Sequence, residues 1–156
     1  MTVHDMRHQE SIDVAAPPAA VYALVSDMPR MGEFSPETVG GRWADGATGS
    51  VGDSYFGDNK IGDREWTVEC LVTVADQDAA FEWVTGAAAE DGPYVRWRYD
   101  FAGNGAGGTT VTETWDVETL PPTLRQLTGE QLAGRTQQVQ RAMAATLAAI
   151  KATAES

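Results

Sequence analysis

The sequence predicts an α+β fold, in which a seven-stranded antiparallel curved sheet packs against one long C-terminal helix and two short helices follow the first strand. The main observation is a change of hydrophobic period. Between residues 39 and 117, apolar and polar residues alternate as they do in strands with one buried face, whereas after residue 128 they recur with helical spacing. A curved sheet must bury its apolar face, and the last helix is long enough to lie across it.

The first elements are a strand and two short helices. RHQESIDV alternates so that Ile12 and Val14 share a face, and the double proline that follows suits the first turn of a helix over AAVYALVSD. After DMP ends this helix, RMGEF predicts a second, shorter helical turn that directs Met31 and Phe34 inward. The next proline breaks the helical pattern.

Six further strands are expected, separated by loops of hairpin length, namely TVGGRW, SYFGDN, REWTVECLVTVAD, AAFEWVTG, YVRWRYDF and TTVTETWDV. The third of these is unusually long, and its alternation places five residues on one face: Trp66, Val68, Cys70, Val72 and Val74. In SYFGDN, Tyr55, Gly57 and Asn59 share a face. A glycine there allows a ligand or another backbone to approach closely, which indicates a lined cavity more than a solid core.

A helix of about seven turns is predicted from roughly residue 128 to residue 154. Its apolar stripe consists of Leu132, Val139, Met143, Leu147 and Ile150, and Thr136 lies on the same stripe. The stripe is the surface that should face the sheet.

Composition limits the classes of function. The 156 residues fit one domain, residues 1–156, and a net charge of −12 disfavours binding to nucleic acid. A single cysteine, Cys70, excludes an internal disulfide. No apolar segment has the length of a signal peptide or a membrane span, so a cytoplasmic protein is expected.

The order of elements, together with PPAAVYALVSD, MGEFSPE, GxxYxGxN, Trp66 and VTETW, resembles the START-like (SRPBCC) superfamily. More narrowly, it resembles the actinobacterial polyketide cyclase/dehydrase-type proteins. Positions that match that pattern are Asn59, Trp66, Glu113 and two glycines expected in strands, Gly52 and Gly57. The resemblance implies a helix-grip fold with a central cavity. The superfamily includes aromatase/cyclases, lipid and hormone carriers and hydrolases, so no single reaction is implied.

A pocket between sheet and helix is therefore expected. Its predicted lining residues are Tyr55, Asn59, Trp66, Trp83, Trp97, Tyr99, Glu113, Trp115, Thr136 and Met143. For the four tryptophans in this set, two interpretations stay open, because indole rings either fill a core or form the walls of a flat apolar slot.

Glu113 lies between Val111 and Trp115 on the predicted inner face, where a carboxylate is rare unless it is paired. One interpretation is a structural role, either as an ion-pair partner of Arg64 or as a group at the rim that reaches solvent. The other is a desolvated carboxyl of raised pKa that binds a ligand or acts as a general base, with Asn59 or Tyr55 polarising a substrate oxygen.

No metal and no cofactor are expected, because the sequence has no CxxC, HxxxH or HExxH motif, and GNGAGG lies between two strands. His4 and His8 are near the N-terminus, where a catalytic role is disfavoured. Cys70 is expected to be an inert core thiol.

The favoured hypothesis is a carrier or sensor of a small hydrophobic molecule, with aromatic and polyketide-like compounds among the candidates. The alternative is a polyketide cyclase, aromatase or dehydrase that uses Glu113 as general base; whether the chain is an enzyme is left open. A scaffold with a vestigial cavity is a third hypothesis, and a homodimer is one arrangement left open.

Overall fold

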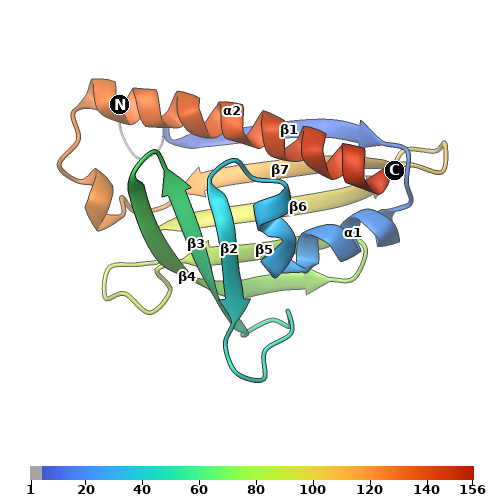
Figure 1. The fold of residues 1–156 in the computed structure, drawn as a ribbon, viewed down its shortest axis with the longest axis horizontal. Helices are drawn as coiled ribbons and strands as arrows, with labels where there is room; N and C mark the ends of the chain where they lie inside the picture. Colours follow the sequence, from blue (N-terminus) through green and yellow to red (C-terminus); the bar gives the residue numbers. More distant parts are fainter. Residues whose placement is uncertain (1–4) are drawn as a thin grey trace.

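A long helix lies along one side of a strongly curved antiparallel sheet (Figure 1). The computed structural model describes residues 5–156, and His4 lies outside them. The chain runs in the order β1 (Arg7–Val14), α1 (Pro18–Ser26), η2 (Met28–Glu33), β2 (Thr38–Trp43), β3 (Ser54–Ile61), β4 (Arg64–Asp76), β5 (Ala80–Thr85), β6 (Val95–Gly103), β7 (Thr109–Val117), η3 (Pro122–Leu124) and α2 (Gly129–Ala154). The predicted fold class is confirmed.

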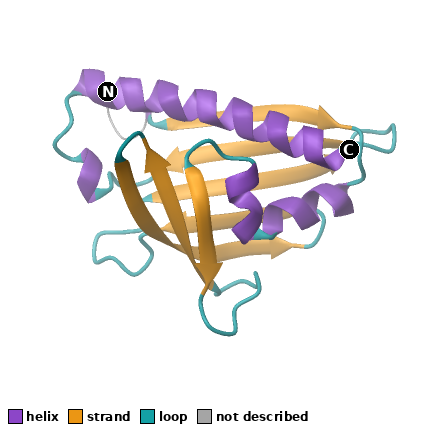
Figure 2. Cartoon of the chain, in the orientation of Figure 1, coloured by secondary structure: helices purple, strands orange, loops and turns teal. Residues whose placement is uncertain are grey.

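The sheet order is β1-β7-β6-β5-β4-β3-β2, and every neighbouring pair is antiparallel. Consecutive strands from β2 to β7 are therefore hairpin partners, as their short connections predict. The first strand pairs with the last, which places β1 at one edge. β2, β3 and β4 run at a steep angle to β5, β6 and β7 (Figure 2), so the sheet wraps around a concave face.

Both α-helices begin where the sequence signals predict. α1 has Pro17 as its N-cap and Pro18 in its first turn, where the missing N–H costs no helical hydrogen bond. α2 begins with a capping box: the Thr128 hydroxyl accepts from the Gln131 N–H at 3.1 Å, and the Gln131 side chain accepts from the Thr128 N–H at 2.9 Å. α2 packs closest to β1 and α1 and also contacts β7.

The core is divided into two clusters. The larger one joins α1, η2, the sheet and the last turns of α2, and includes Val21, Phe81 and Ile150. The smaller one gathers Trp115 and Met143 with other apolar residues of β7 and of the first half of α2. Trp97 packs against both clusters.

Two local expectations are wrong. A β-bulge between Val72 and Val74 shifts the register, so Val74 pairs with Glu82 and does not share the face of Val72; Ala75 takes the inward position opposite Phe81. Gly52 is not a strand residue, because it lies in the turn before β3 with φ +94°.

Within residues 5–156, no helix combines the length and the apolar character needed to cross a membrane.

Candidate functional site

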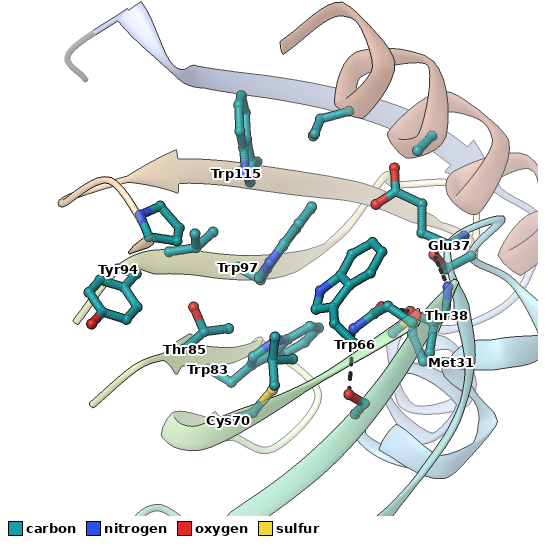
Figure 3. A pocket seen from close by; sticks show the side chains of 18 of the residues that line it. Met31, Glu37, Thr38, Trp66, Cys70, Trp83, Thr85, Tyr94, Trp97 and Trp115 are labelled. Atoms are coloured by element: carbon teal, nitrogen blue, oxygen red, sulfur yellow. Dashed lines mark hydrogen bonds between the residues drawn. The ribbon is translucent and has the colours of Figure 1, made fainter. Parts of the chain in front are cut away.

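A cavity of about 590 Å³ lies between the concave face of the sheet and α2. Its walls come from β3 to β7, from η2 and the start of β2, from the segment around η3, and from one side of α2 (Figure 3). The exposed residues Arg64 and Thr123 are part of the lining, so the cavity reaches solvent between the β3–β4 turn and η3. This volume lies in the ordinary range for small-molecule sites.

Seven aromatic side chains are part of the wall, and four of them are tryptophans. Figure 3 shows Trp66, Trp83, Trp97 and Trp115 projecting from four different strands into the same space. Trp83 stacks on Tyr99 with ring centroids 6.0 Å apart, and Trp97 is tilted against Trp115 at 6.5 Å. Trp83, Tyr99 and Trp115 are almost fully buried, whereas Trp66 and Trp97 are half-buried. The rings thus line a cavity and do not fill it.

Glu113 is the buried carboxyl of this wall. Its side chain is only 2% exposed, and its Oε2 accepts a hydrogen bond from the Tyr99 hydroxyl at 2.8 Å. Oε1 has no hydrogen-bond partner among residues 5–156. Burial raises the pKa of Glu113 to about 8, the hydrogen bond from Tyr99 lowers it, and the charge of Glu10 raises it further.

The expected alternative partner of Glu113, Arg64, is elsewhere. The Arg64 guanidinium lies over the Trp66 ring, 4.9 Å from its centroid, at the exposed start of β4. The interpretations of Glu113 as an ion-pair partner of Arg64 or as a rim group are therefore wrong. With no cation in contact, burial raises its pKa, in the direction expected.

Tyr55 and Asn59 both line the cavity, but each has an internal partner. The Tyr55 hydroxyl donates to the Met28 carbonyl at 3.3 Å, and burial raises the pKa of Tyr55 to about 12. Asn59 accepts from the Thr38 hydroxyl at 3.3 Å, while its amide nitrogen makes only a long contact of 3.5 Å to the Gly57 carbonyl. Of the two, Asn59 has the freer hydrogen-bonding group.

Gly57 lines the cavity, and a Cβ there would meet protein atoms only at ordinary distances of 3.6 Å and more, so no other part of the chain packs closely against it. A close approach between parts of the protein occurs opposite it, at Gly41, where a Cβ would lie 2.1 Å from the Tyr55 hydroxyl oxygen. Gly41 thus makes room for the Tyr55 ring.

On α2, one expected residue does not line the cavity and several unexpected ones do. Thr136 is buried, its hydroxyl donates to the Leu132 carbonyl, and it is not in the cavity wall. Met143 lines the cavity as predicted. The other lining residues of this helix are Arg135, Gln138, Val139, Ala142 and Thr146. Val139 belongs to the predicted apolar stripe. The other four follow helical spacing along one side of that stripe, and the apolar period alone does not identify them.

An ion pair joins α2 to the segment before β2 beside the cavity. Arg135 donates to both carboxylate oxygens of Glu37, at 2.8 and 2.9 Å, and also to the Gln138 side chain at 2.7 Å. Both charged partners are at most a quarter exposed. Arg64 and Arg135 are the two cationic residues of the lining among residues 5–156.

Cys70 also lines the cavity. It is 3% exposed, and burial raises the pKa of its thiol to about 12. Among residues 5–156, no three His, Cys, Asp or Glu side chains are grouped as ligands of a metal ion would be.

Comparison with solved structures shows the fold in other proteins. The Polyketide_cyc-like protein Cgl2372 from Corynebacterium glutamicum is 29% identical, with a TM-score of 0.67 over 94% of this chain and 89% of that one. The Zhui aromatase/cyclase from a Streptomyces species is 16% identical, with a TM-score of 0.70 over 96% and 93%. The di-domain ARO/CYC BexL is 20% identical, with a TM-score of 0.70, and this chain spans 50% of it.

A comparison with proteins of curated function gives no match. A protein-family model, however, matches residues 6–155. The match covers the sheet, α2 and the residues that line the cavity. The chain belongs to the family described as polyketide cyclase/dehydrase and lipid transport.

Proposed function

We propose that this protein carries or senses a small hydrophobic molecule, which it binds in the cavity between the sheet and α2. The observation that supports this most directly is a cavity of about 590 Å³ whose lining is mainly apolar, includes four tryptophans and reaches solvent at one end. Apolar walls with few polar groups are typical of sites for small organic ligands. Stacked and tilted rings favour a flat aromatic or polyketide-like guest over a long acyl chain.

The test is native mass spectrometry of protein recovered after incubation with cell extract. The wild-type protein is expected to retain an apolar compound. Ala142→Phe should abolish retention, because Ala142 lies in the cavity wall and a ring there occupies the cavity. Ala148→Phe, on the exposed side of the same helix, is the matched control and should retain the compound. Equal retention by both variants would place the binding elsewhere and contradict the proposal.

The pair formed by Tyr99 and Glu113 favours a second candidate, a cyclase, aromatase or dehydrase-type enzyme. A carboxyl whose pKa is about 8 can exchange a proton with a substrate near neutral pH. Glu113 would act as the general base, and Asn59 rather than Tyr55 would polarise the substrate oxygen, because the Tyr55 hydroxyl already donates to Met28. The fold neighbours that are named aromatase/cyclases are consistent with this candidate.

The two candidates differ in what happens to the bound compound. A carrier returns it unchanged, whereas an enzyme converts it. Conversion should increase as pH rises through about 8, because the base must be deprotonated. Glu113→Gln should abolish conversion while binding persists.

A further inference from the structure

β1 is an edge strand of the sheet, and every second residue of it directs its backbone groups away from the sheet (Figure 1). The Val117 N–H donates to the Met6 carbonyl at 2.9 Å, which makes these residues a hydrogen-bonded pair of the antiparallel ladder. Because such pairs alternate along a ladder, Arg7, Gln9 and Ser11 direct their N–H and C=O groups to the free edge. These groups have no hydrogen-bond partner among residues 5–156.

The C-terminal end of the same edge is already capped. Lys151 Nζ donates to the Asp13 carbonyl at 2.8 Å, and the Ala15 N–H donates to the Glu155 carboxylate at 2.8 Å. Both contacts agree with the outward direction of the odd-numbered residues, and they limit the open edge to residues 7–11. At the other side of the sheet, η2 packs against the edge strand β2. β1 is therefore the edge that offers free backbone groups to a further strand.

The helix beside this edge does not close it with bulky side chains. Lys151 marks the side of α2 that faces the edge, since its ammonium reaches Asp13. Ala144 and Gln137 lie two and four turns before Lys151 on that side of the helix, and both are exposed. One has a short side chain and the other a flexible polar one. A second strand can therefore approach along residues 7–11.

The sequence of β1 is complementary to itself in one antiparallel alignment. When Gln9 lies opposite Gln9 of a second copy, the free groups of the two strands meet, and His8 of each copy lies opposite Glu10 of the other. An imidazole N–H donor then faces a carboxylate acceptor on both sides of the two-fold axis.

Other alignments of two β1 strands are less favourable. Placing Gln9 opposite Ser11 brings Glu10 opposite Glu10 of the second copy, and like charges across a ladder are destabilising. Placing Ser11 opposite Ser11 requires the Asp13 carbonyl, which Lys151 occupies. Shifts in the other direction pair fewer residues of β1.

We propose that two copies of this chain form a dimer by pairing their β1 strands antiparallel about a two-fold axis at Gln9, which joins the two sheets. Arg7 of each copy lies opposite Ser11 of the other, and the joined edges exchange about six backbone hydrogen bonds. In strand addition of this kind, the backbone supplies affinity and the alternating side chains supply specificity. The surface lies outside the cavity, so the proposal is independent of what the cavity binds.

The first test is sedimentation velocity between about 1 µM and about 1 mM protein. The net charge of −12 on each copy opposes association, so the buffer contains about 0.15 M salt, which screens charges beyond about 8 Å. The apparent mass of the wild-type protein should rise with concentration from 16.7 kDa to twice that value. A wild-type protein that stays monomeric throughout this range overturns the proposal.

Two substitutions at Gln9 test whether the free backbone edge forms the contact. Gln9→Pro removes an N–H that β7 does not use, so the fold should persist, as circular dichroism can verify, while the dimer is lost. Gln9→Thr keeps the N–H and is the matched control, which should dimerise like the wild-type protein. Equal dimerisation of both variants overturns the proposal.

Thiol cross-linking tests the alignment of the two strands. Under copper–phenanthroline oxidation, Gln9→Cys should form a disulfide-linked dimer, because the two positions face each other across the axis. Ser11→Cys should not, since the two Ser11 positions lie about 13 Å apart along the strands. The native thiol, Cys70, is 3% exposed and does not compete. Cross-linking of Ser11→Cys without that of Gln9→Cys contradicts the alignment.

Charge exchange tests the contact between His8 and Glu10 of the two copies. His8→Glu places like charges opposite each other twice, and Glu10→Lys removes both carboxylate acceptors, so each variant alone should dimerise about tenfold more weakly. Mixed together, the two variants should form a heterodimer, because each carboxylate of one copy again faces a cation or an imidazole of the other. Failure of the mixture to associate, with both variants folded, overturns the pairing of His8 with Glu10.

Discussion

Glu10 of β1 lies directly opposite Glu113 of β7 in the antiparallel ladder, so two carboxyl groups occupy neighbouring positions on one face of the sheet. The two groups differ in their surroundings. Glu10 is half-buried and contacts His8, whereas Glu113 is almost fully buried and contacts Tyr99. Like charges directly across a ladder destabilise it. The more deeply buried group is therefore the one that stays protonated, as its pKa of about 8 indicates.

This arrangement predicts that stability falls as pH rises. Glu113 has a pKa of about 8 when folded and 4.5 when unfolded, so the folded state holds more protons between those values. The free energy of unfolding should therefore decrease by about 3 kcal/mol from pH 5 to pH 8. Urea unfolding at a series of pH values measures this change.

The matched control is Glu113→Gln, which cannot titrate. Over the same range its stability should vary much less, and at pH 8 it should be more stable than the wild-type protein. If the free energy of unfolding of the wild-type protein does not fall between pH 5 and pH 8 relative to that of Glu113→Gln, Glu113 is not a neutral buried acid.

Tyr99→Phe should raise the pKa of Glu113 beyond about 8, because the Tyr99 hydroxyl donates the hydrogen bond that favours the charged form. Carboxyl NMR titration gives the value directly. Loss of a buried hydrogen bond should also cost about 1–2 kcal/mol of stability. Tyr22→Phe is the control, since Tyr22 is also buried but its hydroxyl makes no hydrogen bond within residues 5–156. An unchanged or lower pKa in Tyr99→Phe would show that this hydrogen bond does not support the carboxylate.

The sequence was sufficient to predict the strands, α2 and the inward register of the aromatic residues, because these follow from hydrophobic period. It was not sufficient where one residue changes the period. The bulge at β4 reverses the direction of Val74, and nothing in the alternating run REWTVECLVTVAD marks the extra residue.

The candidate site was predictable in its sheet half and less so in its helical half. The α2 stripe identified Met143, but the cavity lies to one side of that stripe, where polar residues such as Gln138 form the wall and Thr136 does not. The hydrogen-bond partners of the cavity side chains could not be predicted from the sequence either. Tyr55 donates to a carbonyl 27 residues away, and only the folded chain brings these groups together.

Gly41→Ala should destabilise the protein by about 2 kcal/mol or more, because its Cβ would lie 2.1 Å from the Tyr55 hydroxyl oxygen and 2.6 Å from the Phe56 carbonyl oxygen. Gly57→Ala, directly opposite in the β2–β3 ladder, is the matched control. Its Cβ would meet only ordinary contacts, so its effect should be clearly smaller. Urea unfolding compares the two variants, and equal losses would show that the Tyr55 ring does not depend on the space at Gly41.

The ion pair between Arg135 and Glu37 should contribute more to stability than an exposed pair. It is bidentate, with both side chains at most a quarter exposed, and it joins α2 to a segment 98 residues away in sequence. A double-mutant cycle with Arg135→Met and Glu37→Gln is expected to give a coupling energy of about 1–2 kcal/mol in urea unfolding. The control cycle uses Arg30 and Glu33, which make a similar bidentate pair three residues apart but are more exposed. Its coupling should be smaller and more sensitive to salt, because solvent screens exposed charges. Couplings of equal size and salt dependence would mean that solvent reaches Arg135 and Glu37 as freely as the surface pair, and that this end of the cavity is more open than the packing of α2 indicates.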